Sequence, residues 1–152
     1  MSRHNPTPVQ EKKYLYVTQE VAFCAAHKLY REELSLEENV SLFGKCANPN
    51  WHGHNYTLYV TVKGTPNPET GFLFDLKKLK VLIVEEVTNH LDHKNLNLDV
   101  PFMQGKLAST ENLVEAFWRI LAPKIGTISR FGKLHSLRLY ETPLNYVEYF
   151  GE

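Results

Sequence analysis

Three histidines have the residue type and spacing of metal ligands. His52 and His54 flank Gly53 at the start of an alternating stretch, so both imidazoles are expected to point to the same side of one strand. His27 ends an earlier β-branched and aromatic stretch, and it lies at the same sheet edge if the two strands pair. Three neutral imidazoles with one open coordination position are typical of a catalytic zinc site. A His-x-His match also occurs by chance, with one ring hydrogen-bonded in a loop.

Two further groups could move a proton beside such a metal. Cys46 lies six residues before His52, in a loop of Gly, Pro and Asn that should leave its thiol accessible as a nucleophile or base. In the Asp92-His93 pair, at a helix end, the carboxylate can orient the imidazole and stabilise its charge. Each group has a structural alternative: a cysteine packed as a small hydrophobe, and a histidine favoured by the helix C-terminus. For Cys24, inside a strand, the packed alternative is the expectation.

Glu141 is a carboxylate at a position where it could bind a ligand. Glu141 ends an apolar strand run, on the side that it shares with Leu137 and Leu139. At that position it either pairs with a cationic side chain or accepts hydrogen bonds from donors on a ligand. The strand pattern alone leaves both possibilities open.

The composition limits the classes of protein that could carry these residues. The chain has 152 residues, with 17 basic and 17 acidic side chains, so its formal charge of zero argues against a protein that coats DNA. An apolar fraction of 43% supports one buried core, and two cysteines are too few for a disulfide scaffold. Residues 1–13 contain no apolar region of the kind that a signal peptide requires, and no stretch approaches the roughly 20 apolar residues that span a bilayer. We therefore expect a cytoplasmic protein without membrane or nucleic-acid partners.

The elements that must position these residues follow the order strand, strand, helix, helix, strand, strand. Alternating or β-branched stretches predict four strands, at residues 14–26, 54–63, 134–141 and 145–150. Residues 1–13 are expected to form a flexible N-terminal tail, and residues 14–152 a single domain. Two hairpins flanking two helices predict an α+β fold with a four-stranded antiparallel sheet.

Both helices are expected between the second and third strands. Asp75 is a suitable N-cap for a first helix whose apolar residues recur at helical spacing. Ser109 and Thr110 offer caps for a second helix, and Pro123 and Gly126 are expected to end it.

Together these motifs resemble the 6-pyruvoyl-tetrahydropterin synthase family. The residues that carry the resemblance are Phe23-x3-His27, Cys46-x5-His52-Gly53-His54, Leu91-Asp92-His93-Lys94-Asn95-Leu96, Ser109-Thr110-Glu111-Asn112-Leu113, Tyr140-Glu141-Thr142 and Tyr149-Phe150-Gly151-Glu152. They occur in the family's order and cover nearly the whole chain from Tyr14 onward. The resemblance implies the T-fold, or tunnelling fold: a trimer whose sheets close into a barrel, two trimers stacked into a homohexamer, and active sites between subunits.

The resemblance also implies roles for the candidate residues. The implied ligands of Zn2+ are His27, His52 and His54. The implied catalytic residues are Cys46, Asp92, His93 and Glu141. The implied substrate-binding residues are Glu141, Thr110 and Glu111. In this scheme the thiol is the general base and the Asp-His pair completes a proton relay. The carboxylate of Glu141 anchors the pterin, because it can accept two parallel N–H donors.

The implied activity is that of a zinc-dependent lyase. Its substrate is 7,8-dihydroneopterin triphosphate, and its products are 6-pyruvoyl-tetrahydropterin, for tetrahydrobiopterin-type biosynthesis, and inorganic triphosphate. Hydrogens move within the substrate side chain, so no external redox cofactor is implied, in agreement with the lack of a Gly-rich nucleotide loop. Lys28, Arg31 and Lys45 could attract the triphosphate or could be solvated surface residues.

Three alternatives to this activity stay in view. The nearest is 6-carboxytetrahydropterin synthase of queuosine and deazaguanine biosynthesis, which shares fold, zinc ligands and substrate but usually has a shorter spacer after the cysteine. A branch that feeds folate synthesis replaces the cysteine with glutamate, which Cys46 argues against. A non-catalytic pterin-binding paralogue is expected to lack Cys46, His93 or Glu141, and all three are present.

Two positions depart from the family pattern. Cys24 stands where a small residue, often serine, is expected, and it adds a second thiol near the strand that carries His27. Trp51 precedes His52 where a small residue is common, so the rim of the pocket is expected to be reshaped. Neither position coincides with a residue assigned to chemistry.

Overall fold

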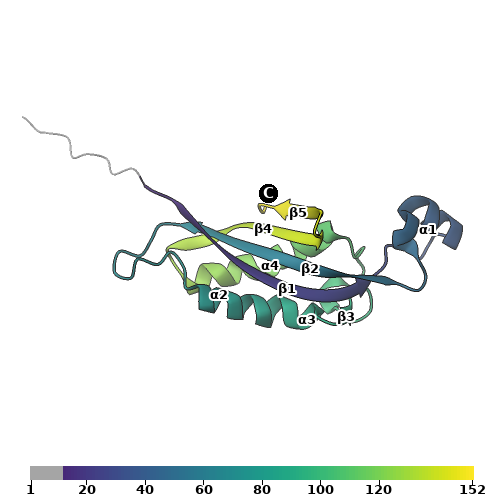
Figure 1. Cartoon of the computed structure of the whole chain (residues 1–152), viewed down its shortest axis with the longest axis horizontal. Helices are drawn as coiled ribbons and strands as arrows, with labels where there is room; N and C mark the ends of the chain where they lie inside the picture. The colour runs from purple at the N-terminus through teal and green to yellow at the C-terminus, as the bar shows by residue number, and fades with distance from the viewer. Residues whose placement is uncertain (1–11) are drawn as a thin grey trace, which may run out of the picture.

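Five strands form one sheet in the computed structural model, which describes residues 12–152 (Figure 1). The strands are β1 (Leu15–His27), β2 (His52–Gly64), β3 (Lys94–Asn95), β4 (Gly132–Thr142) and β5 (Asn145–Tyr149). Their order across the sheet is β3-β1-β2-β4-β5, and only the β1–β3 pair is parallel. The expected four-stranded antiparallel sheet is therefore wrong by one edge strand, because β3 has two residues and such a short strand shows no alternation.

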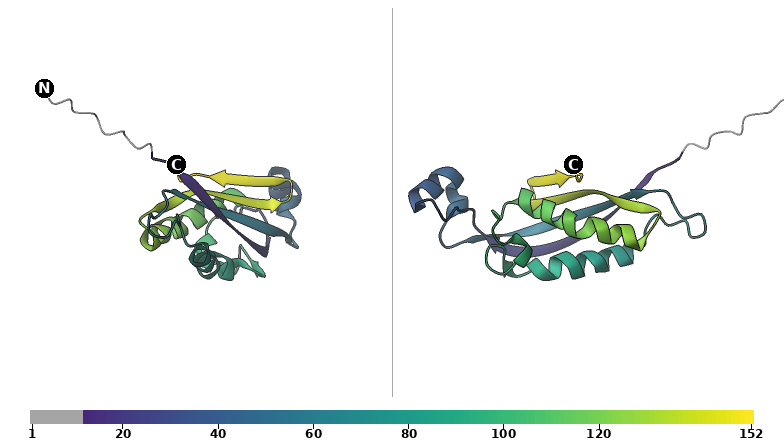
Figure 2. Two further views of the ribbon diagram at one scale, coloured as in Figure 1. Left: turned by 60° about the vertical axis from the view of Figure 1, so that its left-hand side comes forward. Right: turned by 180° about the vertical axis from the view of Figure 1, so that it is seen from behind.

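The helices α2 and α4 cover one face of this sheet, as the two side views show (Figure 2). The helical elements are α1 (Leu36–Phe43), η1 (Gly44–Ala47), α2 (Leu76–Ile83), η2 (Val84–Thr88), α3 (Asn89–Leu91), η3 (Pro101–Met103) and α4 (Thr110–Ile128). The expected first long helix is interrupted by η2, a π-helical segment. A π turn holds one residue more than an α turn, so it changes the face on which the following residues lie.

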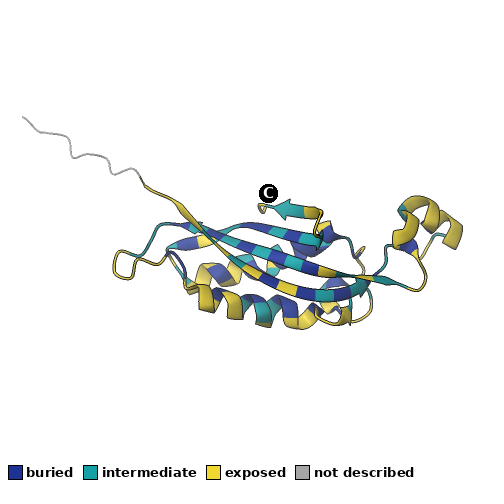
Figure 3. Ribbon diagram, viewed as in Figure 1, coloured by how far each residue is buried: buried dark blue, intermediate teal, exposed yellow. Residues whose placement is uncertain are grey.

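Helix α1 lies between β1 and β2, where no helix was expected. It begins with a capping box: Ser35 accepts a hydrogen bond from the backbone N–H of Glu38, and Glu38 accepts one from that of Ser35. Most of its residues are exposed, and it stands at one end of the sheet, away from the covering helices (Figure 3). Leu36, Val40 and Phe43 recur at helical spacing, so the apolar pattern and the capping box are both signals that could have revealed this helix.

The caps of the two covering helices agree with expectation, but the end of α4 does not. Asp75 accepts hydrogen bonds from two backbone N–H groups in the first turn of α2, and Ser109 accepts one from Asn112. Helix α4 runs through Pro123 to Ile128 instead of ending at Pro123. The continuation places Ile125 in the core with no exposed surface, and this burial offsets the backbone hydrogen bond that proline cannot make.

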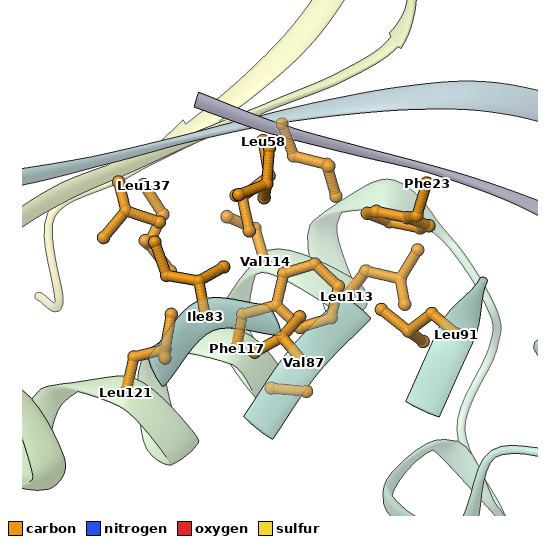
Figure 4. Packing of buried hydrophobic residues seen from close by; sticks show 14 of the residues in the cluster. Phe23, Leu58, Ile83, Val87, Leu91, Leu113, Val114, Phe117, Leu121 and Leu137 are labelled. Atoms are coloured by element: carbon orange, nitrogen blue, oxygen red, sulfur yellow. The ribbon is translucent and has the colours of Figure 1, made fainter. Parts of the chain in front are cut away.

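The core fills the space between the sheet and the two covering helices (Figure 4). From Val21 in β1 and from Tyr56 in β2 every second side chain is buried, and the side chains between them are half-buried or exposed, so one face of the sheet is apolar (Figure 3). Phe23 and Tyr56 stack across the two strands with ring centroids 4.9 Å apart, and Phe117 of α4 meets Phe23 edge-on. The histidines of β1 and β2 continue this buried face to its end.

The sequence also predicts a flexible N-terminal tail and no membrane-spanning segment. The expected N-terminal tail, residues 1–13, lies almost entirely outside the described residues. Within residues 12–152, no helix is both long enough and apolar enough to span a bilayer.

Candidate active site and metal centre

Strand pairing brings three imidazoles together at one end of the sheet. In the antiparallel ladder His52 lies opposite His27, and His54 lies opposite Ala25. The ring centroids of His27 and His52 are 4.5 Å apart, and the other two pairs are each 5.1 Å apart. One ligand atom of each ring lies within 4.8 Å of the other two, so a single metal ion could contact all three.

The backbone around Gly53 is shaped for this close approach. A Cβ at Gly53 would lie 3.0 Å from the carbonyl oxygen of Ala25, so a larger residue would push β1 and β2 apart. Trp51, immediately before His52, has a φ of 67°. A non-glycine residue in this left-handed region is uncommon and strained, and such strain gathers at functional sites.

The donor atoms of the triad fit a metal ion. The Nδ1 atom of His27 lies 2.7 Å from the carbonyl oxygen of Ala108, which can only accept, so Nδ1 carries the proton and Nε2 keeps a free lone pair. Nε2 of His27 and Nδ1 of His52 are buried and have no hydrogen-bond partner within residues 12–152. Buried polar nitrogens without partners are costly, and a bound cation would satisfy them.

Electrostatics favour the neutral rings that metal binding requires. Burial lowers the pKa of His27 below its usual 6.5, and the hydrogen bond to Ala108 opposes this only in part. The pKa of His52 is lowered first by burial and then by the neighbouring His54. An imidazole must be unprotonated to bind a metal, so both shifts keep the ligand form available as pH falls toward 6.5.

A pocket of about 340 Å³ opens beside His27. Its other lining residues are Leu29, Cys46, Ser109, Thr110, Glu111, Glu141, Asn145, Tyr146 and Val147. The structure therefore gathers His27 and four of the other expected site residues around one cavity. Cys46 is exposed in the η1 turn, and its carbonyl oxygen accepts a 2.8 Å hydrogen bond from the backbone of Leu29, two residues after His27.

Glu141 lies next to two of the three histidines, although it is far from them in the sequence. One of its carboxylate oxygens is 3.5 Å from Nε2 of His27 and 3.6 Å from Nε2 of His54. Leu137 and Leu139, on the same side of β4, are fully buried, which confirms the expected face of the strand. The carboxylate is thus held at the inner end of the pocket, where a ligand with N–H donors would meet it.

Asp92 and His93 lie elsewhere, at the edge of β1. The carboxylate of Asp92 accepts a 2.9 Å hydrogen bond from the backbone N–H of Cys24, and its second oxygen lies 3.0 Å from Nδ1 of His93. These two interactions hold the pKa of Asp92 below its usual value, and the hydrogen bond from the backbone of Cys24 has the larger effect. His93 has a φ of 58°, and its side chain is 80% exposed. Neither residue lines the pocket beside His27 in the described part of the chain.

Patterning alone did not identify two neighbours of these groups. Tyr56 is fully buried next to His54, with ring centroids 5.7 Å apart, and its hydroxyl has no partner among residues 12–152. Burial raises the pKa of Tyr56, so the hydroxyl stays protonated. Alternation does place Tyr56 on the face of His54, and that signal could have been used. Cys24 is half-buried on the opposite face and is absent from the described core, so the packing expected for it is wrong.

The chain is similar to known proteins over almost its whole length. The family described as 6-pyruvoyl tetrahydropterin synthase matches residues 16–152. The Homo sapiens 6-pyruvoyl tetrahydrobiopterin synthase is 43% identical over 136 residues, which are 90% of this chain and 91% of that protein. The Dictyostelium discoideum protein of the same name is 40% identical over 136 residues, which are 90% of this chain and 96% of that protein.

A solved structure extends this similarity to the fold. The structure of Caenorhabditis elegans 6-pyruvoyl tetrahydropterin synthase superposes with a TM-score of 0.79 at 34% sequence identity, and the match covers 92% of this chain and 97% of that chain. The α+β arrangement of helices on one face of a sheet is therefore the arrangement of a solved synthase. The motif resemblance, the family match and the structural match agree, and the chain belongs to the 6-pyruvoyl tetrahydropterin synthase family of pterin-biosynthesis enzymes.

Proposed function

We propose that this chain converts 7,8-dihydroneopterin triphosphate into 6-pyruvoyl-tetrahydropterin and releases inorganic triphosphate. The observation that carries the proposal is the histidine triad: two of its ring nitrogens are buried without a partner among residues 12–152, and His27 lines a pocket that also contains Cys46 and Glu141. His27, His52 and His54 would hold Zn2+ through their unprotonated nitrogens. A zinc ion bound there supplies Lewis acidity toward the oxygens of the substrate side chain, which makes the neighbouring C–H bonds more acidic.

Cys46 is the proposed general base. Its thiol is exposed in the same pocket as His27, and the hydrogen bond between its carbonyl oxygen and Leu29 fixes its backbone beside the triad. A thiolate at this position can remove a proton from the substrate side chain, after which the electron pair left on carbon drives out the triphosphate. Because the hydrogens are redistributed within the substrate, this reaction needs no external oxidant or reductant.

The pocket also supplies the proposed binding groups for the pterin ring. Glu141 can accept two parallel N–H donors from the guanidine-like edge of the pterin. Thr110 and Glu111 begin α4 and line the same cavity, with Thr110 buried and Glu111 exposed. A planar ring held between these groups and the triad would present its side chain to Cys46.

Asp92 and His93 are the proposed relay, and their position supports a site shared between subunits. The two residues lie at the edge of β1 beside Cys24, whereas Cys46 lines the pocket beside His27. A neighbouring copy would therefore bring its own Asp92 and His93 to this pocket. A ring of three chains also pairs the free edges of the sheets, which a single chain leaves open. We propose a homohexamer of two stacked trimers, acting in the cytoplasm on a small soluble substrate.

One experiment separates this proposal from its alternatives. The purified zinc-loaded protein is incubated with 7,8-dihydroneopterin triphosphate, and the products are identified by mass. We expect 6-pyruvoyl-tetrahydropterin and triphosphate in equal amounts. Release of triphosphate with a 6-carboxy product would assign the chain to the deazaguanine-type reaction, and ligand binding without turnover would make it a binding protein.

A substitution tests the role of the thiol within that reaction. Cys46→Ala should keep the bound zinc but lose turnover by about 100-fold or more, the usual contribution of a positioned general base. Cys24→Ala serves as the matched control, because it removes the other thiol without touching the pocket beside His27. Full activity of Cys46→Ala would remove Cys46 from the mechanism.

A further inference from the structure

We propose that Cys24, Asp92 and His93 form a second metal site, selective for zinc-like ions, and that a metal bound there inhibits the enzyme. One ligand atom from each of the three side chains lies within 4.8 Å of the other two. A thiolate, a carboxylate oxygen and an imidazole nitrogen are a donor set that suits Zn2+ and Cd2+ and is poor for Mg2+ or Ca2+. The inhibitory effect rests on the proposed function, in which Asp92 and His93 act as the relay.

The backbone holds the three residues together before any ion binds. The N–H of His93 donates a 2.7 Å hydrogen bond to the carbonyl oxygen of Cys24, and the N–H of Cys24 donates a 2.9 Å hydrogen bond to Asp92. Immediately afterwards Lys94 pairs with Ala25 in the parallel β1–β3 bridge. The strained left-handed conformation of His93 is part of the same turn. A preorganised backbone lowers the entropy that ion binding must overcome.

The side chains can close on an ion without moving the core. Tetrahedral zinc, with bonds of 2.0–2.3 Å, needs ligand atoms about 3.3–3.8 Å apart. The side chains of Asp92 and His93 are 45% and 80% exposed, so each can rotate by the small amount required. The ion would replace the proton shared by Nδ1 of His93 and Asp92, and the thiol of Cys24 would lose its own proton. Both protons pass to solvent, and water completes the coordination.

This site is distinct from the histidine triad. Phe23 and Ala25 are buried on the helix-covered side of β1, so Cys24 between them points to the other face of the sheet. His27 belongs to the covered face. Cys24 supplies the only sulfur among the three donors. A serine hydroxyl is a far weaker zinc ligand than a thiolate, so we expect the second site to depend on Cys24.

Metal stoichiometry tests the site without relying on catalysis. The full-length protein, stripped of metal, is titrated with Zn2+ and its bound zinc is measured. We expect two zinc ions per chain, one of them lost in Cys24→Ser, in which the affinity of the second site falls by at least about 100-fold, more than the loss of an outer-shell partner. His52→Ala should lose the other ion and keep the Cys24 site. One zinc ion per chain in the unmodified protein, or two in Cys24→Ser, would overturn the proposal.

Cadmium binding identifies which of the two thiols binds the metal ion. Cd2+ bound by a thiolate produces a charge-transfer absorption in the ultraviolet, and we expect Cys24→Ser to lose it while Cys46→Ser keeps it. The reverse pattern would place the thiolate-bound ion at Cys46 and contradict the site. This readout and the stoichiometry stay valid even if the proposed substrate is not turned over, so the two proposals can fail separately.

Turnover at excess zinc tests the proposed inhibition of the enzyme. Zinc above one equivalent should reduce turnover of the unmodified protein by at least about tenfold, and a chelator that removes only the weaker ion should restore it. Cys24→Ser, which lies outside the proposed catalytic machinery, should keep its basal turnover and resist the excess zinc. Equal inhibition of both proteins would show that the excess ion acts elsewhere.

Discussion

The histidine triad and the Asp92-His93 pair both adjoin β1 and a residue with a positive φ, yet they differ in burial. The triad continues the buried face of the sheet: His27 is 2% exposed, and two ring nitrogens are buried without a hydrogen-bond partner in the described part of the chain. The pair lies at the strand edge, with the His93 side chain 80% exposed on a strained backbone. One chain therefore supplies all three side chains of the group that could hold a metal ion. The Asp92-His93 pair is exposed at the strand edge, as the proposed site between subunits requires.

The largest expected effect is loss of the triad. His52→Ala removes one of three metal ligands, and we expect zinc content to fall and turnover to drop by at least about 1,000-fold, because several kcal/mol of charge stabilisation disappear. Inductively coupled plasma mass spectrometry measures the zinc, and product formation measures turnover. His90→Ala, at an exposed histidine, is the matched control and should change neither. Turnover that persists without bound metal would separate the triad from catalysis.

The comparison predicts that the two regions can be supplied by different chains. Two inactive variants, His52→Ala and His93→Ala, are unfolded together and refolded as mixed oligomers. If each site combines the triad of one subunit with the pair of the next, about a quarter of the sites in a random equal mixture contain both intact parts. Turnover should therefore return to about that fraction. Mixed oligomers that form, as mass spectrometry can verify, but stay inactive would show that the two regions act within one chain.

At His93, the loss of the imidazole should lower activity, whereas the strain of the left-handed backbone should affect stability. Both His93→Gly and His93→Ala remove the imidazole and should lose turnover, but only glycine tolerates a φ of 58°. We expect His93→Gly to have a free energy of unfolding about 1 kcal/mol higher than His93→Ala. Urea denaturation followed by circular dichroism measures the difference. Equal stabilities would mean that the turn relaxes out of the left-handed region in the alanine variant.

The sequence predicts the triad better than it predicts the surroundings of the pair. Alternation in β2 assigns His52 and His54 to one face, and pairing with β1 then leaves His27 little freedom of position. The contact of Asp92 with Cys24 joins residues 68 positions apart through a two-residue strand, and no local pattern encodes it. Helix α1 did leave local signals, the capping box at Ser35 and Glu38 and apolar residues at helical spacing, but the helix has only eight residues. Periodicity detects buried faces, whereas the side chains of Asp92 and His93 are exposed.

The smallest expected effect is a pH dependence of stability that arises from the carboxyl group of Asp92. The hydrogen bond from Cys24, and then the contact with His93, depress the pKa of Asp92 below its usual 3.8 in the folded chain. A carboxyl group with a lowered folded-state pKa stabilises the fold above pH 3.8, and this stability is lost as pH falls through the folded-state value. Asp92→Asn keeps an oxygen that can accept from Cys24 but cannot ionise. Urea denaturation should therefore find Asp92→Asn less stable than the unmodified protein at pH 6, by an amount that shrinks toward zero below pH 3.8. A difference that is constant down to pH 3 would show that it arises from packing rather than from the charge of the carboxylate.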